Sequence, residues 1–478
     1  MSIRRVSPVL VIVVLCFGSL CGALMQSLVI PIQSELPALL GASASSTSWV
    51  VTATLLAAAV TMPVTGRLAD MYGKKRVMTG SAAVLIAGSL VVAMSSTLAP
   101  VLVGRVLQGV AMGYIPVAIS LVREIAPDHL KATAVATVSA TLGVGGALGL
   151  PLAAWIADEW DWHALFWVST GLAVVVFLAT ALLVPHVHDA HPATIDVVGI
   201  LGLAVGLSSA LIGVSKGSQW GWTDAQTLGS IIGGIVVLIA WGYYELRHHD
   251  PLVDLRTTAR PAVLFTNLAA LLIGFGMMAQ SIVVPQLLQM PEATGYGLGQ
   301  TILEAGLWMA PAGLMMLFFA PVSSTLITRK GARVTLAIGA LVIGLGYLLA
   351  LGLMDAPWQL MVASCVAAAG VGIGYAAMPT LILDNVPEDE AGSSVGVNAL
   401  MRSVGTTIAG AVMAALLTSR TMEFAPGVEI PTQDAFSLCF LVGAGFAFAG
   451  AAIALLVPRA NGRGRTDAPA PEPVDASV

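Results

Sequence analysis

The sequence predicts an all-α membrane protein that crosses the bilayer many times. Of its 478 residues, 57% are hydrophobic and only 10% are charged, and the mean hydropathy is +0.90. Soluble domains carry about 25% charged residues. Fourteen successive apolar stretches are long enough to cross a hydrocarbon core of about 30 Å. Helix is the expected structure because it satisfies every backbone polar group within the segment.

The predicted spans follow one another with short connections. They cover residues 8–31, 46–66, 77–97, 100–122, 132–156, 163–184, 196–215, 227–245, 262–288, 300–327, 333–354, 358–381, 392–418 and 435–457.

The distribution of positive charge predicts the orientation. An even number of spans places both termini on one side. With that side in the cytoplasm, seventeen of the 21 Lys and Arg residues fall in cytoplasmic segments. Lys216 and Arg420 fall outside, and Arg105 and Arg402 lie within spans. Because cytoplasmic loops are enriched in Lys and Arg, we expect a multi-pass protein of the plasma (inner) membrane with both termini cytoplasmic.

The two halves of the chain are related as an internal repeat. Glu124 and Pro127 match Asp384 and Pro387 at an offset of 260 residues, and Gly73 matches Gly331 at 258. The repeat predicts a six-helix unit at 1–188, two extra helices at 189–250, a second six-helix unit at 251–458 and a disordered cytoplasmic tail at 459–478. Such repeats typically place a substrate site near the midplane, between the halves.

A short loop after the second span carries the most specific motif. It reads Gly66-Arg67-Leu-Ala-Asp70-Met-Tyr-Gly73-Lys74-Lys75-Arg76, and span 4 contains Gly104-Arg105-Val-Leu-Gln108-Gly109. Both are similar to signature motifs of the major facilitator superfamily, and the fourteen spans resemble its drug:proton antiporter branch. The resemblance implies a major facilitator fold: two six-helix bundles plus two extra central helices.

The resemblance also implies a function. It predicts a proton-coupled secondary exporter of lipophilic or amphipathic small molecules, monomeric in the bilayer, working by alternating access. The span 5 motif around Gly145, Gly149 and Pro151 departs from the antiporter pattern, and Gly22 stands where the family carries an acid. A metabolite facilitator or symporter of the same fold therefore stays open, as does a membrane sensor.

Other function classes find no support in the sequence. Motifs for ATP hydrolysis, zinc proteolysis or serine hydrolysis do not occur. We therefore expect no enzyme activity, no cofactor and no nucleic-acid partner. His186, His188 and His191 form a spacing that metals rarely use alone, so no metal site is predicted.

The loop and the end of span 4 are candidates for a cytoplasmic gate. Asp70 is expected to pair with Arg123 or with the dipole of a nearby helix terminus, which would stabilise one access state. The alternative is a loop that only sets topology. The gate candidates are Gly66, Arg67, Asp70, Gly73, Lys74, Arg76 and Arg123.

Polar residues inside the spans are candidates for the transport path. Arg105 is expected to lie near a proton or substrate site, or else to bond backbone carbonyls. Glu304 is either a deep carboxylate that exchanges protons or an exposed acid at a helix N-terminus. Gln26, Gln108, Asn267, Gln280, Asn398 and Arg402 complete the set of inward-facing polar candidates.

Overall fold

The computed structural model describes residues 7–30, 32–33, 35–187, 193–425 and 428–458. The predicted tail at 459–478 and the residues His188 and His191 lie outside these ranges. Within them, thirteen helices are long and apolar enough to cross a membrane, or fourteen when the bent pair Lys131–Gly146 and Pro151–Glu159 counts as one span. The predicted all-α architecture with many spans is confirmed.

The first half runs from α1 to α9. Its helices are α1 (Pro8–Ser27), α2 (Leu36–Leu39), α3 (Ala44–Thr47), α4 (Trp49–Tyr72), α5 (Lys74–Ala93), α6 (Leu98–Ala111), α7 (Tyr114–Ile125), α8 (Lys131–Glu159) and α9 (His163–Leu183). The two extra helices are α10 (Val197–Trp220) and α11 (Ala225–Glu245).

The second half repeats this order and adds a small hairpin. It contains α12 (Leu255–Thr258), α13 (Pro261–Gln289), η1 (Glu292–Thr294), α14 (Ile302–Lys330), α15 (Ala332–Gly352), α16 (Pro357–Gly374), α17 (Ala377–Leu383), η2 (Glu388–Glu390), α18 (Ala391–Ser419), β1 (Thr421–Ala425), β2 (Val428–Pro431) and α19 (Gln433–Leu456). The strands pair antiparallel. Hydropathy does not predict this hairpin, because it lies in a connection between spans.

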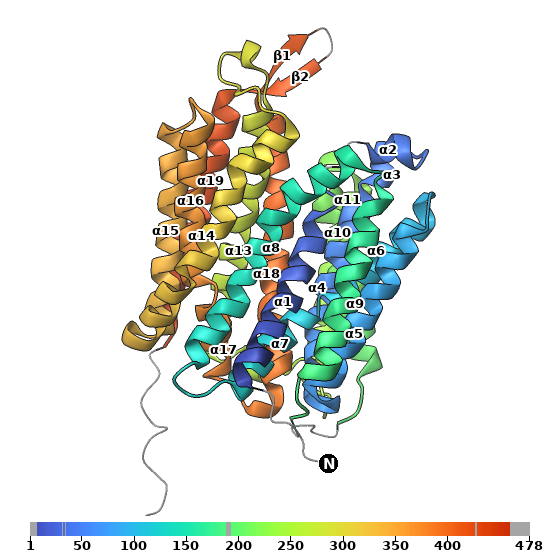
Figure 1. Ribbon diagram of the computed structural model, residues 1–478, viewed down its shortest axis with the longest axis vertical. Helices are drawn as coiled ribbons and strands as arrows, with labels where there is room; N and C mark the ends of the chain where they lie inside the picture. The colour runs from blue at the N-terminus through green and yellow to red at the C-terminus, as the bar shows by residue number, and fades with distance from the viewer. Residues whose placement is uncertain (1–6, 31, 34, 188–192, 426–427, 459–478) are drawn as a thin grey trace, which may run out of the picture.

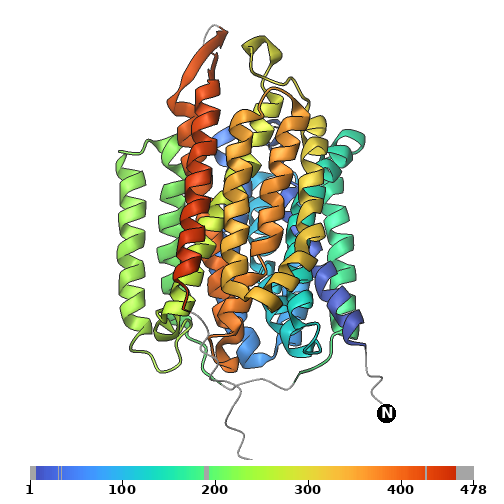
Figure 2. The same ribbon diagram turned by 90° about the vertical axis from the view of Figure 1, so that its left-hand side faces the viewer.

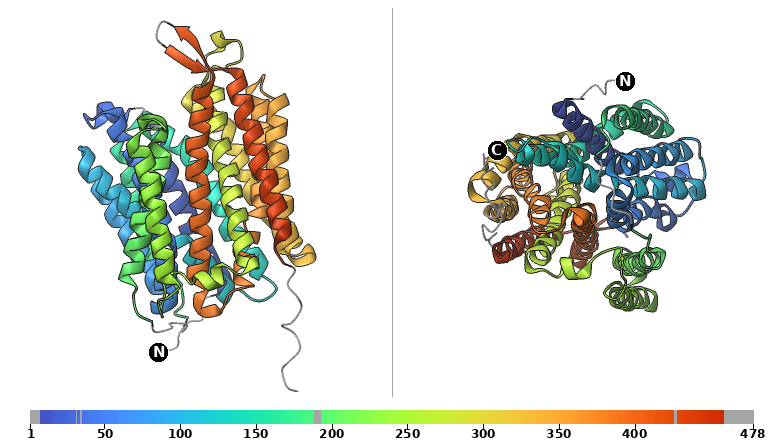
Figure 3. Two further views of the ribbon diagram at one scale, coloured as in Figure 1. Left: turned by 180° about the vertical axis from the view of Figure 1, so that it is seen from behind. Right: turned by 90° about the horizontal axis from the view of Figure 1, so that it is seen from below.

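The two halves stand side by side as helical bundles, each with its own apolar core (Figure 1). The start of α1 and the end of α19 lie at the same end, which we call the basic end; β1 and β2 project from the opposite end, the hairpin end (Figure 2). The pair α10 and α11 flanks the two bundles (Figure 3). Helix α10 packs against α4 and α18, and α11 packs mainly against α10.

The two halves contact each other along two seams, and each seam is formed by one long helix from each half. At the first seam α4 packs against α18, and at the second α8 packs against α14. These four helices correspond in pairs under the repeat, so the seams are related by the pseudo-symmetry of the chain. They are the only surfaces where long helices of the two bundles contact each other extensively within the described residues.

Spans 4 and 12, each predicted as one helix, are broken. Span 4 divides into α6 and α7 around Gly113, and span 12 into α16 and α17 around Tyr375. Glycine favours such a break because it is a poor helix former. A Cβ atom on Gly113 would also collide with the Thr65 side chain, so the residue has a packing role. The breaks lie at equivalent positions of the repeat.

Candidate functional site

Asp70 connects the two halves at the basic end of the first seam. It lies near the end of α4 and is only 3% exposed. Its carboxylate accepts hydrogen bonds from the backbone N–H groups of Gly392 (3.0 Å) and Ser393 (2.8 Å), in the first turn of α18. The N–H groups of a first turn have no partner within their own helix, and the dipole there favours negative charge. Glu390, the N-cap of α18, provides no side-chain cap, so a residue of the other half caps this helix.

Glycines on both helices allow this approach. A Cβ atom on Gly66 would collide with the backbone carbonyl of Gly392, and one on Gly392 would lie 2.6 Å from Asp70 Oδ1. One turn further, a Cβ atom on Gly396 would lie 2.5 Å from the Met62 carbonyl oxygen. Because Gly66 and Asp70 are four residues apart, they share one face of α4. We call Asp70, Gly66, Gly392 and Ser393 the latch.

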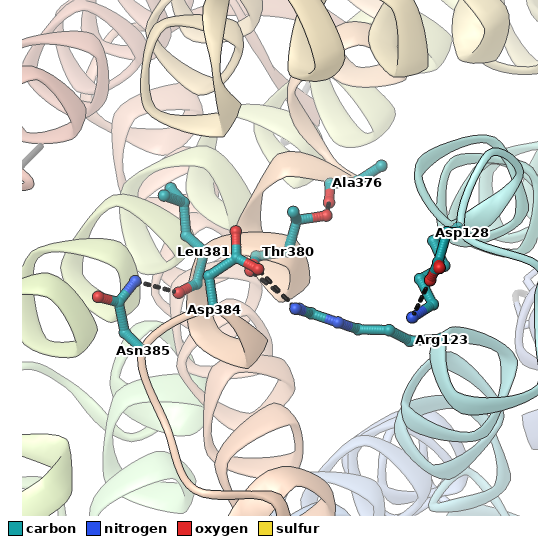
Figure 4. Close-up of polar contacts among 8 residues, drawn as sticks. Arg123, Asp128, Ala376, Thr380, Leu381, Asp384 and Asn385 are labelled. Atoms are coloured by element: carbon teal, nitrogen blue, oxygen red, sulfur yellow. Dashed lines mark hydrogen bonds and ion pairs between the residues drawn. The ribbon is translucent and has the colours of Figure 1, made fainter. Parts of the chain in front are cut away.

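A second contact between the halves joins α7 to the end of α17. Arg123 Nη2 donates to Asp384 Oδ1 at 2.6 Å, and Nη1 reaches the Thr380 carbonyl at 3.5 Å. Figure 4 shows the Arg123 side chain extending across the gap to Asp384. The two side chains are 30% and 43% exposed. The predicted pair between Asp70 and Arg123 does not form, because each of them contacts the second half separately; the helix-terminus alternative describes Asp70 correctly.

The other gate candidates lie within the first half or on its surface. Gly73 has φ of +91° and lets the chain turn from α4 into α5. Lys74 is buried and forms an ion pair with Glu124, which ties α5 to α7. Arg76 is exposed. Arg67 lines a small cavity between α4 and the segments that flank α10 and α11.

The two broken spans, α6–α7 and α16–α17, are fully buried in the part nearer the basic end. Every residue from 111 to 122 is buried, as is every residue from 369 to 379. Toward the hairpin end the same spans carry exposed apolar side chains, such as Val103 (57%) and Trp358 (54%). The latch and the Arg123–Asp384 pair both join the two halves at the basic end.

A polar cluster lies inside the second half, toward the centre of the molecule. Asn398 Nδ2 donates to Asn267 Oδ1, and Arg402 Nη1 donates to Asn398 Oδ1, both at 3.0 Å. The Arg402 guanidinium lies over the Tyr375 ring, 4.4 Å from its centroid. On α18, one face packs against α4 and another, which carries Gly405, packs against α13. Arg402 lies on the helix surface between these two faces. It is half-buried and forms no ion pair within the described residues.

Arg105 is buried inside the first half rather than between the halves. It is 1% exposed; its Nε donates to the Val50 carbonyl at 3.0 Å and its Nη1 to Gln108 Oε1 at 2.7 Å. Gln108 in turn donates to Ser89 Oγ at 3.0 Å. These bonds join α6 to α4 and α5. The geometry corresponds to the alternative of an arginine bonded to backbone, since its recorded partners include no carboxylate.

Glu304 is the clearest correction to the sequence-based set. It is exposed in the first turn of α14, where it forms a capping box with Thr301. Of the two alternatives, the deep, proton-exchanging carboxylate is wrong and the exposed acid at a helix N-terminus is right, because the capping box holds Glu304 at the surface.

The remaining candidates occupy two different settings. Gln26 is exposed although Met25 and Ser27 beside it are buried, and Gln280 is half-buried on α13. The span 5 glycines pack α8 on α1: a Cβ atom on Gly145 would lie 2.5 Å from the Leu20 carbonyl. Gly149 likewise contacts Leu24 and Ser27, and Pro151 meets Gly306 at the second seam.

Sequence reasoning missed the residues that receive the latch. Gly392 and Ser393 carry no charge and form no motif, so their backbone role is invisible in hydropathy. The repeat gave a signal only for the second contact between the halves. It relates the end of α7 to Asp384, and so places Arg123 and Asp384 at equivalent helix ends.

Comparison with known proteins identifies relatives over nearly the whole chain. Residues 15–410 and 266–476 match the model of the Major Facilitator Superfamily. An uncharacterised transporter of this type from Mycobacterium tuberculosis is 27% identical over 421 residues, which are 86% of this chain and 60% of the relative. The chain thus spans about three fifths of that protein's length.

Two further similarities extend the comparison. The multidrug transporter protein MdtP of Bacillus subtilis is 24% identical over 431 residues, covering 88% of this chain and 77% of the relative. Among solved structures, the human organic anion transporter MFSD10 superposes with a TM-score of 0.66 over 94% of this chain and 99% of that chain. At 14% identity this likeness concerns the fold alone.

Proposed function

Because the chain belongs to the major facilitator superfamily of secondary transporters, we propose that it exports lipophilic or amphipathic small molecules in exchange for protons, by alternating access. In this proposal the basic end faces the cytoplasm, both termini are cytoplasmic and the protein resides in the plasma (inner) membrane. The relatives named as a multidrug transporter protein and as a multidrug resistance protein homolog support drug-like molecules as the class of cargo.

The observation that carries the proposal is the latch. Alternating access requires contacts between the halves that form in one access state and break in the other. Asp70 on α4 caps α18, so its two hydrogen bonds persist only while the basic end is closed. Hydrogen bonds to a charged group contribute about 1.5–3 kcal/mol. A contact of that size holds one state yet can be released by a protonation or by cargo.

Proton coupling has a candidate group in the same carboxylate. Protonation of Asp70 would remove its charge from the positive end of the α18 dipole. The latch would weaken and the basic end would open. Asp70 is buried near the end of α4 and stands between the halves, so a change in its charge acts directly on their contact.

The cargo site is proposed around Arg402. Its guanidinium, stacked on Tyr375, is half-buried at the centre of the molecule and has no carboxylate partner among the described residues. Half-buried Met277, Met278 and Met309 add adaptable apolar surface in the same half. This combination suits a lipophilic molecule that carries a hydrogen-bond acceptor or a negative charge.

Transport into everted membrane vesicles tests the proposal. A panel of cationic, neutral and anionic compounds is offered with and without an imposed pH gradient. We expect gradient-driven uptake of a lipophilic compound, reduced by Arg402→Gln and by Asp70→Asn at equal protein levels. Uptake that persists after collapse of the gradient would overturn proton coupling, and movement in the symport direction would support the facilitator or symporter alternative.

A further inference from the structure

Two buried carboxyl groups meet at the basic end of the extra helices. Asp196 is the N-cap of α10 and Glu245 is the last residue of α11; they are 6% and 2% exposed. A Cβ atom built on Gly199 would collide with both Asp196 Oδ2 and Glu245 Oε1. The two oxygens are therefore next to each other. We call Asp196 and Glu245 the carboxylate pair.

The hydrogen bonds of the pair leave these two oxygens without a donor. Asp196 Oδ1 accepts from the Gly199 amide (2.7 Å) and the Tyr244 hydroxyl (2.9 Å). Glu245 Oε2 accepts from the Val253 amide at 3.3 Å, and the Leu252 amide lies beside the same carboxylate. Within the described residues, Asp196 Oδ2 and Glu245 Oε1 form no hydrogen bond. An ionised carboxylate can only accept, so Asp196 Oδ2 and Glu245 Oε1 cannot bond to each other while both groups are ionised, and two facing negative charges would be buried.

We propose that the carboxylate pair binds one proton: Glu245 Oε1 carries it and donates to Asp196 Oδ2. One O–H bond forms, the net charge of the pair falls from −2 to −1, and both orphan oxygens gain a partner. Glu245 is the carrier because it is the more buried group and accepts a longer hydrogen bond, from the Val253 amide. Asp196 accepts two shorter hydrogen bonds and shares a cavity with Arg67, and both favour its ionised form. The indole N–H of Trp241 lies beside Glu245 and has no partner of its own, so it is the competing donor for this carboxylate.

The other charged and titratable groups around the pair come from three elements. Helix α4 contributes Arg67 and α11 contributes Tyr244, whose hydroxyl also contacts His248 Nδ1 at 3.2 Å. The connection after α11 contributes Asp250, which accepts from the amide (3.3 Å) and hydroxyl (3.0 Å) of Thr194. These bonds hold the pKa of Asp250 below its ordinary value. Asp250 therefore stays ionised at neutral and alkaline pH, where the pair would lose its proton.

A short path connects the pair to the latch. The Val253 amide donates to Glu245. The carbonyl of the preceding residue, Leu252, accepts a hydrogen bond from Ser393 Oγ at 3.2 Å. The Ser393 amide donates to Asp70. Loss of the shared proton would leave Glu245 charged and strengthen the hydrogen bond that it accepts from the Val253 amide, which would hold residues 252–253 more firmly. The extra helices would then transmit the protonation state at the basic end to the contact between the halves.

Infrared difference spectroscopy of the full-length protein in lipid nanodiscs tests the shared proton. We expect a carbonyl band of a protonated carboxylic acid that disappears at alkaline pH. The band should be absent in Glu245→Gln, where the amide donates in place of the acid, and in Asp196→Asn, where Glu245 can ionise. It should persist in Asp355→Asn, a control at an exposed carboxyl between α15 and α16, and in His248→Gln.

Hydrogen exchange of the peptide covering 246–254 gives a second measurement. Wild-type protection should rise at alkaline pH relative to Glu245→Gln measured at the same pH, because only the wild-type side chain becomes a charged acceptor for the Val253 amide. A band unchanged by Glu245→Gln, a band retained in Asp196→Asn, or a pH response abolished by His248→Gln would each overturn the shared proton. Neither measurement involves transport, so failure here leaves the proposed export function to its own test.

Discussion

The two seams between the halves are related by the repeat but are built differently. At the first seam Asp70 is buried and caps α18 across the halves. At the second seam the equivalent residue is Thr328, which is exposed and bonds back to Ser324 of its own helix at 2.8 Å. Leu130, the N-cap residue of α8, which is the counterpart of α18, provides no side-chain cap.

The packing of the two seams differs in the same sense. At the first seam glycines bring backbone against backbone, so neither helix can shift without loss of contact. At the second seam Gly143 faces the flexible side chain of Met316, which can change rotamer as the helices slide. The pseudo-symmetric molecule therefore concentrates its polar, position-specific contact at one seam. The second seam keeps an adaptable surface.

Gly66→Ala should have the largest effect, because it disturbs the close packing that distinguishes the first seam from the second. The added methyl group would collide with the Gly392 backbone, and a backbone neighbour cannot yield by a rotamer change. We expect transport to fall by more than about tenfold, because a loss of 1.4 kcal/mol already shifts an equilibrium tenfold. Gly80→Ala, on α5 with no atom within 4 Å of the new methyl, is the matched control and should transport normally. Equal loss in both variants would contradict the packing argument.

Asp70→Asn should have the next largest effect. The amide keeps one acceptor but loses the charge at the α18 N-terminus. The closed basic end should be destabilised by about 1–3 kcal/mol, a shift of roughly tenfold to a hundredfold toward the open state. Cysteine labelling near the basic end and transport assays at equal expression would both report it. Thr328→Val at the second seam is the control; normal transport by a well-expressed Asp70→Asn protein would refute the latch.

Gly143→Ala should be tolerated better than Gly66→Ala. Its methyl group meets only the Met316 side chain, so we expect a cost on the order of 1 kcal/mol or less after repacking. Thermal stability in detergent and initial transport rates measure it. A loss as large as that of Gly66→Ala would mean that the second seam is as rigid as the first.

Arg123→Gln should have the smallest effect. The pair with Asp384 is partly exposed, and such pairs contribute about 0.2–1 kcal/mol. Transport should fall less than about fivefold and the loss should be greater at low salt. The charge-swapped double variant Arg123→Asp/Asp384→Arg should recover part of it; a swap that recovers nothing would show that Arg123 acts elsewhere.

Much of the fold could be predicted from the sequence because hydropathy and charge act locally. The spans, their helical nature and the distinctive motif at 66–77 follow from runs of residues along the chain. The motif is predicted as a loop, but α4 continues to Tyr72 and α5 begins at Lys74, so only Gly73 lies outside a helix. The breaks around Gly113 and Tyr375 could not, since they depend on the close approach of other helices.

The site was less predictable for the same reason. Asp70 was recognisable as a charged group beside a span, but its partners are backbone amides at Gly392 and Ser393, some 320 residues later. Glu304 shows the opposite error, because its first-turn position decided its role more strongly than its apolar neighbours. Asp196 and Glu245 stand at helix ends in the sequence, and only the folding of α10 onto α11 brings them together.

Helix α10 has a consequence for the speed of the transport cycle. Its leucines at 203, 207 and 211 pack with Leu56 of α4 and with Val397 and Leu400 of α18, and Lys216 contacts Ser48 and lies over the Trp49 ring at 4.8 Å. One helix thus packs against both halves. In the proposed alternating-access cycle this helix would separate from, or slide along, one of them, so we expect α10 and α11 to set part of the turnover time.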